Sequence, residues 1–349
     1  MTESTKPLVI TQGDPAGIGP EIIAHLFREA AGDVRGCFVA GDVATLRRAC
    51  AVVAAEGVPH AVAQIGSPLE AFSVPPRCVP VLQTVASAPL PEFGRVAASA
   101  GRAAADSVIW AARAALRGEV AAMVTAPLHK EALAAAGVAF PGHTELLQAE
   151  AAVHLGQTVA QTPVRMMLAS DELRTVLVSI HVSLRDAIAA VTQSQVFETL
   201  RITHESLGEV LGRVPRIAVA GLNPHAGEGG LFGTEEREAI APAIARALDA
   251  GMDVSGPFAP DTVFMRARSA PGHPGEFDVV VAMYHDQGLI PVKYLGVDKG
   301  VNVTLGLPLV RTSPDHGTAF DIAGTGKADP SSLREAVRMA RLLSAGRRS

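Results

Sequence analysis

The stretch that decides the fold reads PLVITQGDPAGIGPE and spans Pro7–Glu21. Its first residues, Pro7–Thr11, form a short apolar run typical of a buried strand, and the amphipathic segment that follows Pro20 is typical of a helix. The glycines between them allow a sharp turn and a close backbone approach to a ligand. The free amides of a helix N-terminus can bind an anion. The Rossmann dinucleotide fingerprint is incomplete, because Ile22 stands at its third glycine. A plain strand-to-helix turn, with Pro20 at the first helical position, is the alternative.

Similar short apolar runs recur along the chain, and each is bounded by Gly, Pro or Asp. They are nearly continuous rather than alternating, as expected of strands buried on both faces of a mostly parallel sheet. The further predicted strands are Cys37–Ala40, Val79–Leu82, Ala121–Thr125, Thr175–Ile180, Arg216–Ala220 and Asp278–Met283.

Helical patterns lie between these runs. Arg95–Leu116 is rich in alanine, Thr234–Leu248 opens with Thr-Glu-Glu, and Ser331–Leu343 begins with a serine suited to capping a helix. The alternation of strands and helices predicts an α/β architecture with helices on both faces of the sheet.

Composition narrows the class of protein. The net charge is -5, the aromatic content is 4%, and no run of five like charges occurs, so we expect no nucleic-acid partner. The three cysteines, Cys37, Cys50 and Cys78, form no CxxC pair and suit a reducing compartment. The sequence has no signal-peptide pattern and no apolar run of about 18 residues, which a membrane helix needs. We therefore expect a cytoplasmic protein that does not enter membranes.

Histidines follow three of the predicted strands. His181 ends one strand, and His225 and His285 lie just beyond two others. Ligands of open parallel sheets bind outside the carboxyl ends of the strands, so these imidazoles are candidate ligands for a divalent metal. A hydrogen-bonded structural role is the alternative for each of them.

Cations and small polar residues form another candidate group. His143 and Thr144 begin a predicted helix, whereas Lys293, Asn302 and Arg311 stand among apolar residues. A cation in an apolar context needs a partner or a ligand. Such groups can hold a phosphate or carboxylate, and salt-bridged surface cations are the alternative.

A long glycine-rich segment, Asp315–Pro330, reads DHGTAFDIAGTGKADP. Few of its residues are large, so it predicts a loop that could wrap the adenosine part of a cofactor. A plain surface loop is the alternative.

Taken together, these segments resemble the 4-hydroxythreonine-4-phosphate dehydrogenase (PdxA) family. The motifs GDPAGIGPE, GHTE, NPHAGEGG, YHDQG and VNVTLGLP-VRTS-DHGTA-DIAG occur in the family's order, from Gly13 to Asp329. The glycine-rich loop also resembles the loop of isocitrate and isopropylmalate dehydrogenases that holds NAD without a Rossmann domain.

The resemblance implies two α/β/α domains with mostly parallel sheets, as in isocitrate and isopropylmalate dehydrogenases, and an active site in the interdomain cleft. It implies a homodimer with shared active sites. We expect a cofactor-side domain of residues 1–126 plus 284–349 and a second domain of residues 127–283, which carries dimer and metal residues.

The resemblance also implies the roles of individual residues. The expected metal ligands are His181, His225 and His285, and the metal is Zn, Co, Mn, Ni or Mg. The expected contacts of a small anionic substrate are His143, Thr144, Lys293, Asn302 and Arg311. The expected contacts of NAD, with NADP left open, are Gly13, Asp14, Gly17, Gly19, His316, Gly317, Thr318 and Asp321.

The predicted reaction is oxidation of a secondary alcohol on a small phosphorylated hydroxy acid. The substrate would be 4-hydroxythreonine-4-phosphate or threonate or erythronate 4-phosphate, and decarboxylation could follow. Asp286, Lys293 and a metal-bound water are alternative general bases, and Asp286 could instead orient a metal ligand. Gln12 and the Phe320-Asp321-Ile322 run depart from the biosynthetic pattern and resemble a paralogous catabolic branch.

Two other functions stay open at this point. One is a cis-dihydrodiol dehydrogenase of the terephthalate type, although that relative tends to lack the GHT and Arg anchors. The other is a non-redox metal-dependent hydrolase or lyase, or a phosphate-binding protein, and the adenosine-type loop argues against it.

Overall fold

The computed structural model describes residues 6–296 and 299–346. These residues form two compact units, residues 6–163 with 307–345, and residues 164–296 and 299–306 with Gly346. The domain boundaries expected after residues 126 and 283 stay a prediction.

The first unit contains a fully parallel run of strands in the order β3-β4-β2-β1-β5-β12. Their bounds are Leu8–Thr11 (β1), Cys37–Gly41 (β2), Val62–Ile65 (β3), Val79–Gln83 (β4), Ala122–Thr125 (β5) and Arg311–Pro314 (β12). Every residue of β1, β2 and β5 is buried, which explains their continuous apolar sequences.

The helices of this unit are Gly19–Glu29 (α1), Val43–Ala54 (α2), Ala98–Leu116 (α3), Lys130–Ala135 (α4), His143–Leu155 (α5) and Ser331–Gly346 (α11), with short turns at Pro68–Phe72 (η1) and Val159–Gln161 (η2). Asp42 caps α2 by accepting the backbone N–H of Thr45. Helix α5 ends at Gly156, whose φ of 66° is left-handed, as is common at helix C-termini.

The second unit contains strands in the order β11-β6-β7-β10-β8-β9. The β11–β6 and β6–β7 pairs are antiparallel and the remaining pairs are parallel. The bounds are Arg165–Ala169 (β6), Arg174–Leu177 (β7), Ile217–Ala220 (β8), Val254–Phe258 (β9), Val279–Ala282 (β10) and Val301–Leu305 (β11). The expectation of a mostly parallel α/β protein is confirmed in both units.

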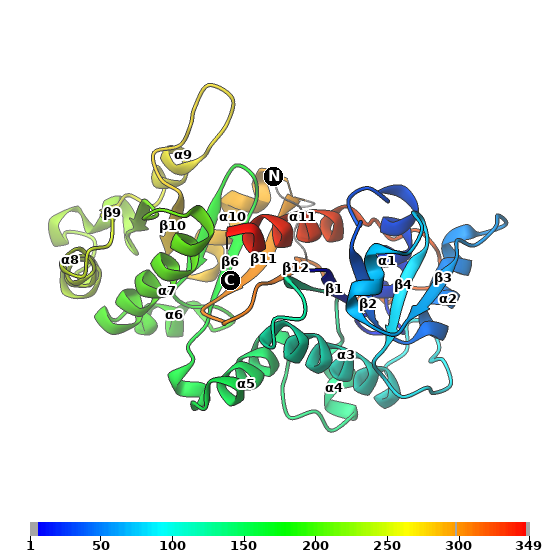
Figure 1. Cartoon of the computed structure of the whole chain (residues 1–349). Coiled ribbons are helices and arrows are strands. Elements are labelled where there is room, and N and C mark those ends of the chain that lie inside the picture. Colours follow the sequence, from blue (N-terminus) through cyan, green and yellow to red (C-terminus); the bar gives the residue numbers. More distant parts are fainter. Residues whose placement is uncertain (1–5, 297–298, 347–349) are drawn as a thin grey trace. The chain divides into compact units, whose positions relative to one another are not determined.

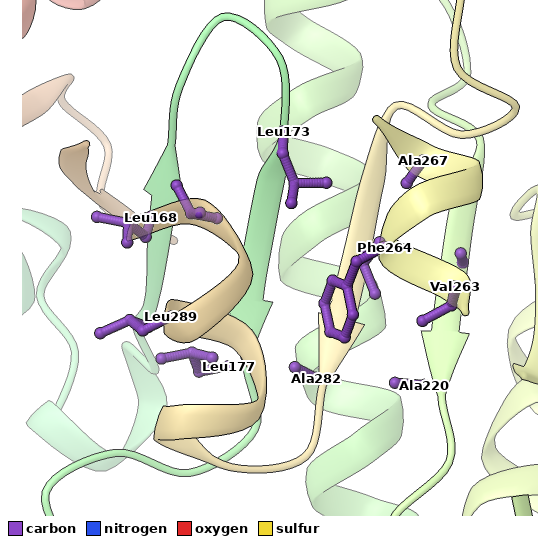
Figure 2. Close-up of a cluster of buried hydrophobic side chains, with 12 residues drawn as sticks. Leu168, Leu173, Leu177, Ala220, Val263, Phe264, Ala267, Ala282 and Leu289 are labelled. Atoms are coloured by element: carbon purple, nitrogen blue, oxygen red, sulfur yellow. The ribbon is translucent and has the colours of Figure 1, made fainter. Parts of the chain in front are cut away.

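The helices here are Leu184–Ala190 (α6), Gln193–Leu211 (α7), Ala241–Asp249 (α8), Val263–Ala267 (α9) and His285–Tyr294 (α10), with the short elements Pro224–Gly230 (η3) and Glu236–Ile240 (η4). Helices α9 and α10, which are labelled in Figure 1, cover one face of these strands. Figure 2 shows Leu289 of α10 beside Leu177 of β7, and Phe264 of α9 pointing toward the strands. This apolar layer fixes α10, and with it His285, at the end of β10.

The described part of the chain contains no helix that is long and apolar enough to cross a membrane. Its three cysteines are free thiols, and Cys37 and Cys50 are buried.

Candidate active site

The turn after β1 is fixed against the segment that follows β5. Gly13 has a φ of +72°, and a Cβ atom there would lie 2.5 Å from the Pro127 carbonyl oxygen, so the position requires glycine. Asp14 donates its backbone N–H to the same carbonyl at 2.9 Å. Its Oδ1 atom accepts the N–H of Ala16 at 2.8 Å. Two strand ends therefore meet at Asp14.

Among the described residues, several polar atoms buried at this junction lack hydrogen-bond partners. Burial raises the pKa of Asp14, and the Ala16 N–H and His129 act in the opposite direction. Within the described residues, Asp14 Oδ2 and His129 Nδ1 are buried without a hydrogen-bond partner. The His129 ring stacks on Phe320, with centroids 4.5 Å apart. Buried polar atoms of this kind are rare unless a ligand or water completes them.

The sequence did not single out His129. It lies four residues beyond β5, in Ala126-Pro127-Leu128-His129. The signal that could have found it is the one that identified the other histidines, namely position after a buried strand.

The glycine-rich loop packs on the start of α1. Ile18 donates its backbone N–H to the Thr318 carbonyl at 3.0 Å. A Cβ atom on Gly17 would lie 2.9 Å from the Thr318 Cβ, so the two segments touch through glycine. His316 and Asp321 are exposed on this loop. The structure thus brings together the two segments predicted to bind the cofactor.

A buried arginine lies at the start of β12. Arg311 is only 4% exposed. Its Nε and Nη2 atoms donate to the Thr125 hydroxyl at 3.1 Å and 2.7 Å. Burial lowers the pKa of Arg311 to about 10, so the guanidinium is still charged at neutral pH. Thr125, the last residue of β5, was not predicted from the sequence.

His143 faces the same cation. Burial and the nearby Arg311 hold the pKa of His143 well below 6.5, and a hydrogen bond with the backbone of Ala126 acts in the opposite direction. Its ring is therefore neutral at pH 7. The Nε2 atom is buried without a hydrogen-bond partner among the residues that the structure describes. Thr144 follows in the first turn of α5. A cation, a neutral imidazole and a helix start thus lie together in the first unit.

In the second unit, His181 and His285 lie close together. Their ring centroids are 5.8 Å apart. His181 follows β7 and has a left-handed φ of 48°, which is uncommon outside glycine. His285 begins α10, and its Nδ1 atom lies 2.7 Å from Asp286 Oδ1. The carboxylate fixes one ring nitrogen and leaves Nε2 for another partner.

His225 lies in a strained loop. It and the next four residues all have left-handed φ values, between 44° for Glu228 and 79° for Gly227. Each non-glycine residue in this region costs about 1–2 kcal/mol. The Nδ1 atom of His225 lies 3.0 Å from Glu228 Oε2, which repeats the carboxylate–imidazole arrangement of His285.

Two buried side chains hold this loop in place. Glu236 Oε1 accepts the backbone N–H groups of Leu222 and Asn223, both at 2.7 Å. Gln287 donates to the Gly221 carbonyl at 2.8 Å and accepts the Met283 N–H at 2.7 Å. The ends of β8 and β10 are therefore linked side by side.

Two further residues that the sequence predicted as substrate contacts lie in this unit. Lys293 is half-buried in the last turn of α10, and Asn302 is half-buried on β11. Across residues 6–296 and 299–346, no group of three or more His, Cys, Asp or Glu residues could hold a metal ion. His181 and His285 are thus brought together in one chain, whereas His225 does not complete a set of three with them.

Comparison with known proteins identifies relatives along the whole chain. The family described as pyridoxal phosphate biosynthetic protein PdxA matches residues 33–340. A 4-hydroxythreonine-4-phosphate dehydrogenase of Beijerinckia indica is 53% identical over 331 residues, which are 95% of this chain and 93% of the relative. A D-threonate 4-phosphate dehydrogenase of Salmonella typhimurium is 45% identical over 338 residues, covering 96% of this chain and 98% of the relative.

A solved structure gives the same result. The crystal structure of a 4-hydroxythreonine-4-phosphate dehydrogenase from Klebsiella pneumoniae is similar with a TM-score of 0.87. The two chains are 43% identical, and the match covers 99% of each.

Proposed function

The chain belongs to the PdxA family, and from that premise we propose that it is a metal-dependent NAD dehydrogenase of a phosphorylated four-carbon hydroxy acid. Its relatives are dehydrogenases named for 4-hydroxythreonine-4-phosphate and for D-threonate 4-phosphate. Both names describe a four-carbon chain with a terminal phosphate. We propose oxidation of the secondary alcohol next to the phosphorylated carbon, on one or both of these substrates.

The observation that carries the proposal is the buried Arg311 with Thr125 and His143. Charged at neutral pH and held at Nε and Nη2 by one hydroxyl, Arg311 can present its guanidinium to a dianion. The neutral His143 ring donates its one N–H to the Ala126 backbone, so its unpartnered Nε2 atom is an acceptor for a substrate hydroxyl beside the phosphate. Burial strengthens both interactions, because little water competes. We propose this group as the anchor of the substrate phosphate.

Two histidines of the second unit can each offer one ring nitrogen to a divalent metal. Nδ1 of His225 and Nδ1 of His285 each face a carboxylate, which leaves Nε2 of each ring to coordinate. We propose that these two residues and His181 hold the metal, with ligands contributed by two subunits of a homodimer. A bound divalent cation lowers the pKa of a substrate hydroxyl and so favours its deprotonation.

The first unit has features that fit NAD. Asp14 Oδ2 and His129 Nδ1 are buried polar atoms without partners in the described residues, and Asp321 is an exposed carboxylate able to accept ribose hydroxyls. Gly17 packs directly on Thr318, so the turn after β1 and the glycine-rich loop lie in contact. The nicotinamide ring accepts the hydride when the cofactor is bound. NADP stays an alternative.

The proton from the substrate hydroxyl needs an acceptor on this chain. Lys293 is half-buried in the last turn of α10, and Asp286 lies at the first turn of the same helix. Because Asp286 is 2.7 Å from His285 Nδ1, we assign it the orientation of that ring. Lys293 is then the proposed base.

Exposed apolar side chains support the homodimer. Ile290 and Tyr294, one turn apart on α10, are 63% and 91% exposed. We propose that these two side chains form part of the dimer interface. We propose that the dimer works in the cytoplasm, as its composition suggests.

The experiment follows NADH absorbance with purified, metal-loaded protein. Its substrates are 4-hydroxythreonine-4-phosphate, the 4-phosphates of threonate and erythronate, and an aromatic cis-dihydrodiol, each with and without chelator. We expect chelator-sensitive turnover of a phosphorylated acid. Turnover of the dihydrodiol alone would overturn the phosphate anchor, and no NADH from any substrate would favour a non-redox role.

A further inference from the structure

The glycine-rich loop depends on α1 for its shape. Residues 315–330 contain no helix or strand, yet they carry His316 and Asp321. A cofactor contact must be held in a fixed geometry to bind tightly. Something outside the loop must therefore order it.

Glu21 of α1 makes the key contacts. Its side chain is fully buried. One carboxylate oxygen accepts the backbone N–H of Gly326 at 3.0 Å, and the other accepts the N–H of Gly324. One turn later on α1, His25 Nε2 lies 3.1 Å from the Gly326 carbonyl oxygen. Two side chains of one helix face thus engage both backbone groups of Gly326.

The other end of the segment is fixed to the same helix. The Ile18 N–H, at the start of α1, donates to the Thr318 carbonyl. The stretch from Thr318 to Gly324 therefore forms a bridge whose two ends are both bonded to α1. Asp321 lies between these ends and is exposed. The two bonded ends of the bridge thus hold the exposed Asp321 carboxylate in a fixed position.

Burying the Glu21 carboxylate costs free energy, and the hydrogen bonds from the loop backbone offset this cost. Burial raises its pKa, whereas the two glycine N–H groups and the charges of His25 and Arg48 lower it. A buried carboxylate is expensive unless hydrogen bonds compensate it, and here the loop backbone supplies them. Gly324 and Gly326 have left-handed φ values of 80° and 68°, which suit glycine at the bonded positions.

We propose that Glu21, assisted by His25, is a positioning residue for cofactor binding. It sets the geometry of the bridge, and so the affinity for NAD, without touching the substrate. This inference rests on the proposed role of the loop in NAD binding. Loss of Glu21 should raise the Kd for NAD about tenfold or more and leave the KM of the phosphorylated substrate unchanged, because that anchor lies elsewhere.

The test compares Glu21→Ala and Glu21→Gln with the matched control Glu56→Gln, an exposed residue just beyond α2. The Kd for NAD is measured by calorimetry. Trypsin cleavage after Lys327, an exposed residue of the loop, reports loop order without reference to activity. We expect both substitutions to weaken NAD binding and to speed cleavage, with the glutamine variant less affected because it keeps one acceptor.

The outcomes separate this inference from the proposed function. Faster cleavage with unchanged NAD affinity would overturn the link between the loop and the cofactor. Unchanged cleavage and unchanged affinity would overturn the positioning role. A wild-type protein that binds neither NAD nor NADP would instead refute the dehydrogenase proposal, while the cleavage assay would still test loop order. Should Glu21→Ala fail to fold, His25→Ala, at a half-buried position, provides the same comparison with a smaller expected effect.

Discussion

The buried carboxylate of Glu236 accepts the backbone N–H of Asn223 at 2.7 Å, two residues before His225. It binds the neighbouring Leu222 N–H at the same distance. The loop that carries His225 has a run of left-handed residues and needs such external support to keep its shape.

Glu236→Ala should therefore weaken metal binding. We expect the affinity for Co²⁺, followed by its visible absorbance, to fall at least about tenfold, as for other residues that orient ligands. The free energy of unfolding should fall by about 1.5–3 kcal/mol, because hydrogen bonds to a buried charge are lost. Glu238→Gln, an exposed neighbour, is the control. Equal metal affinity in both variants would show that the loop does not present a ligand.

Asp286 and Lys293 should behave differently. Asp286→Asn weakens the bond that orients His285, so we expect an about 10–100-fold loss of metal affinity and recovery of kcat at saturating metal. Lys293→Met should keep metal and NAD affinity and lower kcat by about 10²–10⁴-fold. If Asp286→Asn lowered kcat at unchanged metal affinity while Lys293→Met lowered metal affinity, Asp286 would be the base.

Thr125→Val tests the support of the buried arginine. The substitution keeps the shape of the side chain and removes the hydroxyl that accepts from Nε and Nη2 of Arg311. A lost acceptor of a charged donor corresponds to about 1.5–3 kcal/mol. We expect kcat/KM for the phosphorylated substrate to fall about 10–100-fold, with NAD affinity unchanged. A normal kcat/KM would mean that Thr125 does not orient the anchor.

Because His143 is neutral in the folded protein, we predict that the free energy of unfolding depends on pH. Its pKa lies well below 6.5 in the folded protein, whereas the unfolded chain binds the proton near 6.5. As the pH falls below about 6.5, the unfolded state thus binds more protons than the folded state. The free energy of unfolding then falls by up to about 1.4 kcal/mol for each pH unit. His143→Leu should remove this component. Urea titrations of the ligand-free protein at several pH values measure the difference, and parallel pH profiles for both proteins would contradict it.

The sequence predicted the strands that are buried on both faces. β1, β2, β5, β8 and β10 are continuous apolar runs, and each lies where the pattern indicated. Strands with a different chemistry were missed. β9 contains a Gly-Pro pair, β12 begins with Arg311, and β3 is partly exposed. Their sequences lack the continuous apolar pattern on which the prediction depended.

The site was predicted in part for similar reasons. Position after a buried strand identified His181 and His285, which the structure places together. The left-handed conformation of His225 and Glu228 could not be predicted, because non-glycine residues rarely adopt it. The partners of Thr125 and Glu21 lie 186 and more than 300 residues away in the sequence. No local sequence pattern indicates contacts between residues so far apart.

The most direct test of the central claim compares D-threonate 4-phosphate with D-threonate in the wild-type enzyme and in Arg311→Lys. Lysine keeps the charge and loses the planar fork. Arg334→Lys, at an exposed surface pair, is the control. We predict that Arg311→Lys lowers kcat/KM for the phosphorylated acid about 10–100-fold and leaves the slow turnover of the unphosphorylated acid unchanged. An equal loss for both acids, or no loss for either, would contradict the assignment of Arg311 as the phosphate anchor.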